Sequence, residues 1–162
     1  MGAEPDIEGK PRMDLDAIDA VEFGQSLKGL GVNLLVKDVP RSVAFLTDVL
    51  GMQAFQPTAD FAILRSGTAV LQVHADRTYH SNPLPQLLPE SGARGGGAEL
   101  RLYDVDPDAA FAKALAHEGA TVLQDVKNKP HGLREAYILD PDGYCWVPSR
   151  SLNDAETKAL DA

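Results

Sequence analysis

Along the first half of the chain, stretches with the apolar spacing of a strand and a stretch with the apolar spacing of a helix follow one another. The order of these stretches predicts the secondary structure. Residues 30–36 form an apolar, strand-like run. In residues 38–50 the apolar positions instead fall on one face of a helix, which Gly51 ends. Three further runs predict strands at residues 52–55, 61–65 and 69–74, the last two joined by a turn at residues 66–68. The pattern predicts one βαβββ module.

The second half of the chain repeats this order. Residues 97–102 correspond to the first strand, and Phe111 falls in the following helix where Phe45 falls in the first. Strands at residues 135–139 and 144–147, turned by Asp-Pro-Asp-Gly at residues 140–143, complete the second copy. The sequence therefore predicts an α+β fold, with two tandem βαβββ modules whose mixed sheets curl around a shared cavity.

The segments around the repeats complete the predicted organisation. Leu15, Ile18 and Val21 recur at helical spacing and predict a short amphipathic helix ahead of the first module. Prolines and glycines between the modules predict a linker long enough to act as a mobile lid. The predicted parts are an N-terminal tail and helix at residues 1–26, the first module at 27–78, the linker at 79–96, the second module at 97–152 and a C-terminal tail at 153–162.

The net charge of the chain argues against nucleic acids and membranes as partners. The 162-residue chain carries 24 acidic and 15 basic residues, and its net charge of −9 repels phosphate backbones and anionic membranes. We therefore expect no nucleic-acid partner and no membrane partner. No apolar run approaches the roughly 20 residues of a spanning helix, and the polar N-terminus lacks signal-peptide order, so we expect a cytoplasmic protein. The single cysteine, Cys145, excludes an internal disulfide and is expected to be buried.

Three motifs carry a resemblance to a known family. Residues 36–51 contain Val-Lys-Asp-Val, Arg-Ser-Val-Ala-Phe and Asp-Val-Leu-Gly, Asp-Pro-Asp-Gly occupies residues 140–143, and His-Gly-Leu-Arg occupies residues 131–134. In this order, residues 29–150 resemble the vicinal-oxygen-chelate superfamily of glyoxalases, bleomycin-resistance proteins and extradiol dioxygenases. The resemblance implies a divalent metal in the cavity, bound by the first and last strands of each module and chelated by vicinal oxygens of the substrate.

The sequence departs from that superfamily at its metal-ligand positions. These positions correspond to Gly31, Gly97, Val147 and either Leu71 or Gln72, none of which is a carboxylate or an imidazole. Since a divalent cation needs several oxygen or imidazole ligands, we expect no metal cofactor here. The alternative is a displaced divalent-metal site one layer along the cavity wall, formed by residues that each follow an expected ligand position by two: Asn33, His74, Glu99 and Ser149.

Strand alternation predicts which side chains face the cavity, because neighbouring residues of a strand point to opposite faces. The apolar set Leu34, Val36 and Leu102 suits packing under the helices. His131 corresponds to a position that borders the pocket in the superfamily. The expected cavity-facing ligand contacts are Asn33, Gln72, His74, Glu99, Arg101 and His131. The competing interpretations are a surface ion pair for Glu99 with Arg101, and an exposed strand-end histidine for His74.

Three functions remain open on these residues. The first is a protein resembling bleomycin-resistance proteins, which binds a small molecule between its modules without metal and forms a homodimer. The alternative is a superfamily enzyme, a lyase, isomerase or dioxygenase, that uses a displaced metal or acid–base chemistry of Glu99 and His74. The third is a regulatory or scaffolding protein with a vestigial cavity, since fold alone does not establish chemistry. A pocket filled by Leu35, Phe61 and Trp146 would favour the third.

Overall fold

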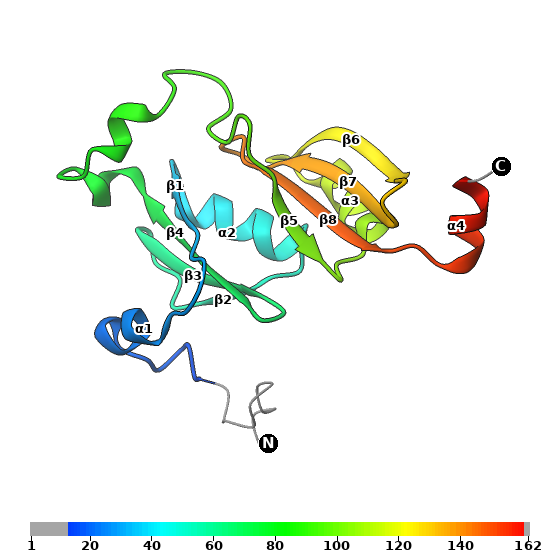
Figure 1. The fold of residues 1–162 in the computed structure, drawn as a ribbon. Helices are drawn as coiled ribbons and strands as arrows, with labels where there is room; N and C mark the ends of the chain where they lie inside the picture. The colour runs from blue at the N-terminus through cyan, green and yellow to red at the C-terminus, as the bar shows by residue number, and fades with distance from the viewer. Residues whose placement is uncertain (1–12, 161–162) are drawn as a thin grey trace.

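The structure is a computed structural model that describes residues 13–160. The predicted tail at residues 1–12 lies outside the described residues. Both predicted modules are present, and Figure 1 shows them side by side along the chain. The fold class is therefore confirmed as α+β with two βαβββ units.

The first module builds a four-stranded mixed sheet with one helix. Its elements are β1 (Asn33–Val36), α2 (Val39–Asp48), β2 (Gln53–Phe55), β3 (Phe61–Ser66) and β4 (Ala69–Ala75). The strand order is β1-β4-β3-β2, with β1 parallel to β4 and the other pairs antiparallel. Asp38 caps α2 by accepting a hydrogen bond from the backbone N–H of Arg41 at 2.9 Å. This cap fixes where the strand gives way to the helix.

The second module repeats the topology. Its elements are β5 (Leu100–Tyr103), α3 (Pro107–Ala116), β6 (Thr121–Asn128), β7 (Leu133–Leu139) and β8 (Cys145–Ser151). The strand order is β5-β8-β7-β6, with β5 parallel to β8. Asp106 caps α3 as Asp38 caps α2. Both first strands begin later than predicted, at residues 33 and 100, because the chain before them bends at glycines with positive φ, Gly29 at 69° and Gly97 at 83°.

In the described part of the chain, four short helical segments lie outside the modules. The N-terminal helix α1 (Ala20–Ser26) begins later than predicted because the Asp19 side chain accepts bonds from Val21 and Glu22, which places the cap there. Two 3₁₀ turns, η1 (Asp76–Tyr79) and η2 (Leu84–Leu87), lie between the modules. A last helix, α4 (Asp154–Leu160), occupies the segment predicted as a tail and extends away from the body in Figure 1.

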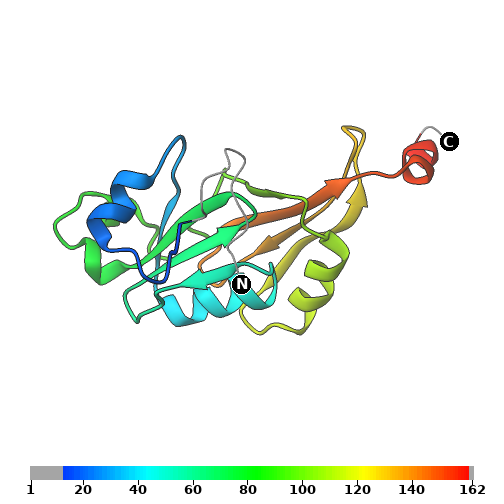
Figure 2. The same cartoon turned by 90° about the horizontal axis from the view of Figure 1, so that it is seen from below.

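The two modules share one hydrophobic core on the helix side of the sheets. Figure 2 shows α2 and α3 on one side of the sheets and α1 on the other. Leu34 and Val36 of the first module and Leu102 and Trp146 of the second belong to the same buried cluster. The predicted packing of Leu34, Val36 and Leu102 under the helices is confirmed. Phe45, fully buried, adds an edge-on contact to His117, with 5.9 Å between ring centroids.

The turn at residues 140–143 fastens the second module to the first. The buried Asp142 carboxylate accepts a hydrogen bond from the backbone N–H of Lys37 at 3.1 Å and from Ser42 Oγ at 3.5 Å. Asp140 holds the turn itself by accepting bonds from Tyr144 N–H at 3.0 Å and Trp146 Nε1 at 2.9 Å. Burial raises the pKa of Asp140, and these bonds oppose the rise. Two buried carboxylates thus organise the contact between the modules.

The end of the linker packs onto the same turn. Arg94 forms a bidentate pair with Asp76, with both N–O distances at 2.7 Å, and also donates to the carbonyl of Leu35 at 3.0 Å. Gly143 has a φ of 82°, and a Cβ there would lie 2.5 Å from Cα of Ala93. Only glycine allows this close approach, so the turn needs Gly143 for packing as well as for its backbone conformation.

The two sheets remain separate and do not close around a common cavity. The modules join through their helix-side core, and an open groove separates β4 from β5 on the other side. The predicted shared cavity is therefore present only as this groove. Within residues 13–160, no helix is long and apolar enough to cross a membrane.

Substitution Asp142→Ala should weaken the contact between the modules. The change removes the buried carboxylate that accepts the N–H of Lys37 in a part-buried hydrogen bond, so we expect a loss of about 1.5–3 kcal/mol in the free energy of unfolding. Urea denaturation checks this value. Asp125→Ala, at an exposed position of β6, is the matched control and should change stability by less than about 0.5 kcal/mol. Equal effects from the two substitutions would contradict the assigned role of Asp142.

Candidate functional site

The six predicted ligand contacts divide into two groups of three, one on each sheet. Asn33, Gln72 and His74 lie on the first sheet, where Asn33 is the register partner of Gln72. His74 Nε2 lies 3.3 Å from Gln72 Oε1. The His74 ring also contacts Phe61 and Tyr79, with centroids 5.0 and 5.3 Å away, and burial lowers its pKa. Gln72 and His74 are half-buried, Asn33 is exposed, and His74 is the member of the three that contacts these aromatic rings.

The N-terminal segment covers much of this face of the first sheet. Leu15, Ile18 and Phe23, each at most 7% exposed, pack against Ile63 in a second hydrophobic cluster. Gln56 holds the segment in place because its Nε2 donates to the carbonyls of Leu15 at 2.7 Å and Ile18 at 2.9 Å. Gln56 has a φ of 47°, an uncommon conformation for a residue other than glycine. A strained residue thus fastens a cover over the first sheet.

The other three predicted contacts are brought together on the second sheet by a residue that the sequence analysis missed. Glu135 of β7 is only 1% exposed, and its carboxylate accepts a hydrogen bond from Arg101 Nη2. Its Oε2 lies 3.2 Å from His131 Nε2. Arg101 also donates to Glu99 at 2.8 Å. Glu99, Arg101 and His131 therefore belong to one network centred on Glu135.

Further polar groups extend the network along β6 and β7. Lys129 Nζ lies 4.0 Å from Glu135 Oε1 and donates to Gln124 Oε1 at 3.0 Å. Arg101 has a raised pKa: burial opposes its charge, but the bonds to Glu99 and Glu135 outweigh burial. The bond from Arg101 holds the pKa of Glu99 below its ordinary value. Burial raises the pKa of Tyr137, which hydrogen-bonds Glu99 and Arg101.

Strand alternation carries the signal that could have identified Glu135. Strand β8 lies between β5 and β7, and its residue Ser149 has two register partners. These are Glu135 of β7 and Tyr103 of β5. Alternate residues of β5 and β7 therefore share one face with Glu99 and Arg101. Extending the alternation that placed Glu99 and Arg101 to β7 would have added Glu135 and Tyr137.

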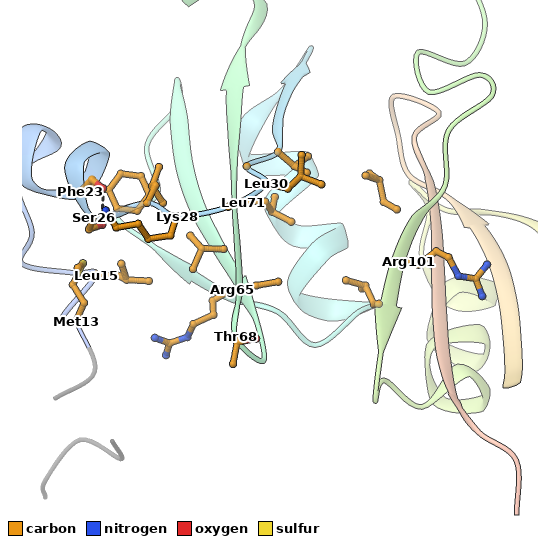
Figure 3. A pocket seen from close by; sticks show the side chains of 18 of the residues that line it. Met13, Leu15, Phe23, Ser26, Lys28, Leu30, Arg65, Thr68, Leu71 and Arg101 are labelled. Carbon is orange, nitrogen blue, oxygen red and sulfur yellow. Dashed lines mark hydrogen bonds between the residues drawn. The ribbon is translucent and has the colours of Figure 1, made fainter. Parts of the chain in front are cut away.

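A groove of about 830 Å³ runs between the modules. One wall is the N-terminal segment with β4, the other is β5, and Figure 3 shows Phe23, Leu30 and Leu71 on the first wall. Arg101 lines the second wall, but its guanidinium points away from the groove in Figure 3. The groove is thus lined mainly by apolar side chains. Two members of the Glu135 network, Glu99 and Arg101, contribute to the groove lining, whereas Glu135 and His131 do not.

The three side chains that would have filled a vestigial cavity do not fill this groove. Trp146 is 1% exposed and Leu35 is 3% exposed, and Trp146 belongs to the shared core while forming part of the groove lining. Phe61 packs instead against the cluster of the N-terminal segment. The groove remains open, although it is more apolar than the polar pocket expected from the sequence.

The residues at the superfamily's metal positions do not fit a divalent metal. Gly31 and Gly97 precede the strands, Val147 is fully buried, and Gln72 offers one amide oxygen that lies beside His74. The alternative position Leu71 belongs to the core. Across residues 13–160, no three His, Cys, Asp or Glu side chains are gathered closely enough to hold a metal ion.

The residues of the predicted displaced metal site are divided between the sheets in the same way. His74 lies on β4, whereas Glu99 precedes β5 and bonds to Arg101. Ser149 donates its hydroxyl hydrogen to the carbonyl of Leu102 at 3.1 Å. In the described part of the chain, no hydrogen bond or ion pair joins His74 to Glu99. The structure thus does not bring together the predicted acid–base pair.

Paired βαβββ modules with a groove between them define the class of this protein. The model of the Glyoxalase/Bleomycin resistance protein/Dioxygenase superfamily matches residues 30–147. The chain belongs to this superfamily.

Solved structures of that class have the same fold. A glyoxalase/bleomycin resistance protein/dioxygenase family enzyme from Burkholderia phytofirmans PsJN is 23% identical, with a TM-score of 0.63, over 75% of this chain and 97% of its own. TioX from Micromonospora sp. ML1 is 26% identical, with a TM-score of 0.55, over 77% of this chain and 99% of its own. A glyoxalase-related enzyme from Fulvimarina pelagi is 17% identical, with a TM-score of 0.60, over 76% of this chain and 88% of its own. No curated protein matches this chain in sequence.

Substitution Gln56→Ala should loosen the cover on the first sheet. Alanine keeps the Cβ and hence the backbone strain, but removes both hydrogen bonds to the N-terminal segment, each worth about 0.5–1.5 kcal/mol. We expect faster amide hydrogen exchange in residues 15–23, measured by mass spectrometry. Gln86→Ala, at an exposed linker position, should leave that exchange unchanged. Unaltered protection in Gln56→Ala would show that the apolar contacts alone hold the segment.

Proposed function

We propose that this protein binds a small organic molecule in the groove between its two modules, without a metal cofactor. The observation that carries the proposal is the groove itself. Its volume of about 830 Å³ lies within the range of about 300–1,000 Å³ typical of ligand pockets. This function is the one expected for a protein resembling bleomycin-resistance proteins.

The lining favours a ligand with an apolar body. Met13, Leu27 and Leu30 line the groove and are 41%, 39% and 92% exposed. Exposed apolar side chains gathered in one groove are typical of a binding surface. The charged residues of the lining are Lys28, Arg65, Glu99 and Arg101, of which the last two pair with each other. The ligand would therefore be recognised mainly by shape and apolar contact.

The test uses the single tryptophan, because Trp146 lines the groove. We expect 8-anilinonaphthalene-1-sulfonate to bind, measured by energy transfer from Trp146, and a small-molecule collection is then screened for compounds that displace it. Leu30→Glu should weaken binding about tenfold, because burying a leucine side chain contributes about 1.5 kcal/mol or more. Leu30 is largely exposed, so the fold should tolerate the change.

Two controls make this result specific. Leu87→Glu alters a leucine that is 79% exposed but lies on η2, outside the groove lining. This variant should bind 8-anilinonaphthalene-1-sulfonate with the affinity of the unmodified protein. Addition of EDTA should leave binding unchanged. Equal affinity of Leu30→Glu and Leu87→Glu would contradict binding in the groove, and loss of binding with EDTA would contradict the metal-free proposal.

We also propose that the chain forms a homodimer. Supporting this, β1 and β5 are edge strands with one paired neighbour each, and Tyr103 at the end of β5 is 62% exposed. Sedimentation velocity at micromolar concentration should give twice the 17.4 kDa chain mass. A single species with the mass of one chain would contradict the dimer and leave the groove proposal unaffected.

A further inference from the structure

The Glu135 network lies on a face of the second sheet that, among residues 13–160, has no counterpart to the apolar cover of the first. On the first sheet, Leu15 and Phe23 pack over the equivalent side. On the second sheet, that side carries Glu135, Arg101, Glu99, Tyr137 and the turn residues Lys129 and His131. The two modules share a topology but present opposite chemistry.

Stability alone is a weak explanation for a carboxylate buried there. Removing a carboxylate from water costs several kcal/mol, and replacing a buried ion pair by apolar residues is often neutral or stabilising. Glu135 is nevertheless 1% exposed, with Arg101, Lys129 and His131 around its two oxygens. On β6, Lys127 is its register partner. This arrangement indicates a chemical use for the carboxylate.

Glu135 orients the ring of His131. The turn places His131 one residue before Gly132, whose φ is 86°, and the backbone N–H of Gly132 donates to the carbonyl of Lys129 at 3.0 Å. The His131 side chain is 54% exposed, and Nε2 is its ring nitrogen beside the carboxylate, at 3.2 Å. A carboxylate that accepts the Nε2–H bond leaves the lone pair on Nδ1. A buried carboxylate behind an exposed histidine is the arrangement of a general base with its orienting group.

A donor for a developing negative charge, Lys129, lies on the same face. Lys129 and His131 flank the two oxygens of one carboxylate, since Lys129 Nζ lies 4.0 Å from Oε1 and His131 Nε2 lies 3.2 Å from Oε2. Gln124 Nε2 is buried and has no hydrogen-bond partner within the described residues, although Gln124 Oε1 accepts a bond from Lys129. The Lys129 side chain is 23% exposed, so its ammonium is suited to stabilising an oxyanion, whereas the buried Gln124 Nε2 is out of reach of a substrate.

Two side-chain nucleophiles on β8, Ser149 and Cys145, are occupied or suppressed, and we take water as the nucleophile. The Ser149 hydroxyl donates to the carbonyl of Leu102 and is fully buried. Burial raises the pKa of the Cys145 thiol, so little thiolate is present. His131, by contrast, is accessible to solvent. An open face with an oriented base suits hydrolysis better than a reaction that must exclude water.

We propose that this face is a hydrolytic site for small activated esters, with His131 as the general base and Glu135 as its positioning residue. Nδ1 of His131 takes a proton from water, and the oxygen of that water forms a bond to the ester carbonyl carbon. The carbonyl oxygen becomes an oxyanion beside the ammonium of Lys129. The C–O bond to the leaving group then breaks, and the proton on His131 passes to the departing oxygen. One ester and one water give one acid and one alcohol, and no metal or redox partner takes part.

The test is the hydrolysis of 4-nitrophenyl acetate by the full chain in the presence of EDTA, followed by the absorbance of 4-nitrophenolate. We expect multiple turnovers and no accumulated acyl-protein in the mass spectrum. His131→Ala should lower kcat on the order of 100-fold, the lower end of the range for loss of a general base. Added imidazole should restore turnover in His131→Ala beyond the rate of imidazole without protein. Restoration of this kind distinguishes a catalytic from a structural role.

Positioning by Glu135 has its own readout. Glu135→Gln keeps the shape of the side chain, and we expect it to lower kcat while leaving KM unchanged. The ¹⁵N signals of the His131 ring should show that the tautomer protonated on Nε2 is no longer preferred. His80→Ala changes a histidine whose Nδ1 lies 2.7 Å from the carbonyl of Arg77, and it should hydrolyse the ester as the unmodified chain does.

Several outcomes would overturn the inference. The first is ester hydrolysis by the unmodified chain that is no faster than by His131→Ala. The second is a loss of kcat in His80→Ala equal to that in His131→Ala. The third is a stoichiometric acyl-protein without turnover. A circular-dichroism spectrum and melting temperature of His131→Ala that match the unmodified chain exclude misfolding, as expected for an exposed turn residue. The result is independent of groove binding, which Trp146 reports separately.

Discussion

The fold depends on the Asp142 carboxylate, which reaches from the second module to the first strand and helix of the first. Its oxygens accept the N–H of Lys37, where β1 ends, and the hydroxyl of Ser42, inside α2. Apolar contacts between the modules are not directional, and further directional contacts there are the hydrogen bonds from Tyr144 and Arg94 to the carbonyl of Leu35. The charged acceptor fixes the relative position of the helices, and the shared core then forms around Phe45 and Trp146. The groove on the other side of the molecule is a consequence of that position.

The sequence predicted the module topology because each element carried a local signal. Alternation correctly placed Leu34 and Leu102 in the core, and Asp38 marked the start of a helix through its capping position. Periodicity did not predict that the N-terminal segment folds back over the first sheet. That contact depends on Gln56, which is 41 residues from Leu15 and in a backbone conformation that its side chain does not signal.

The candidate site was predicted only in part, because local patterns identify single residues and not the long-range contacts between them. Glu99, Arg101 and His131 were identified singly, from alternation and from the resemblance, and the structure joins them. The residue that joins them, Glu135, belongs to a strand whose two faces were not separated in the sequence analysis. Which of two similar sheets would be covered could not be predicted either. That outcome depends on long-range packing of Phe23 against Ile63, and no local pattern encodes such a contact.

The anchoring of Arg94 has a consequence for how this protein can vary in length. Asp76 and Arg94 are 18 residues apart, yet their bidentate pair closes the segment between them into a loop whose ends are fixed on the body. The cost of closing such a loop grows only slowly, by about 0.6 kcal/mol for each doubling of its length. Insertions and deletions between η1 and Gly92 should therefore be inexpensive, since neither module is moved by them. In related chains this loop is the place where length can diverge while the two modules keep their mutual orientation.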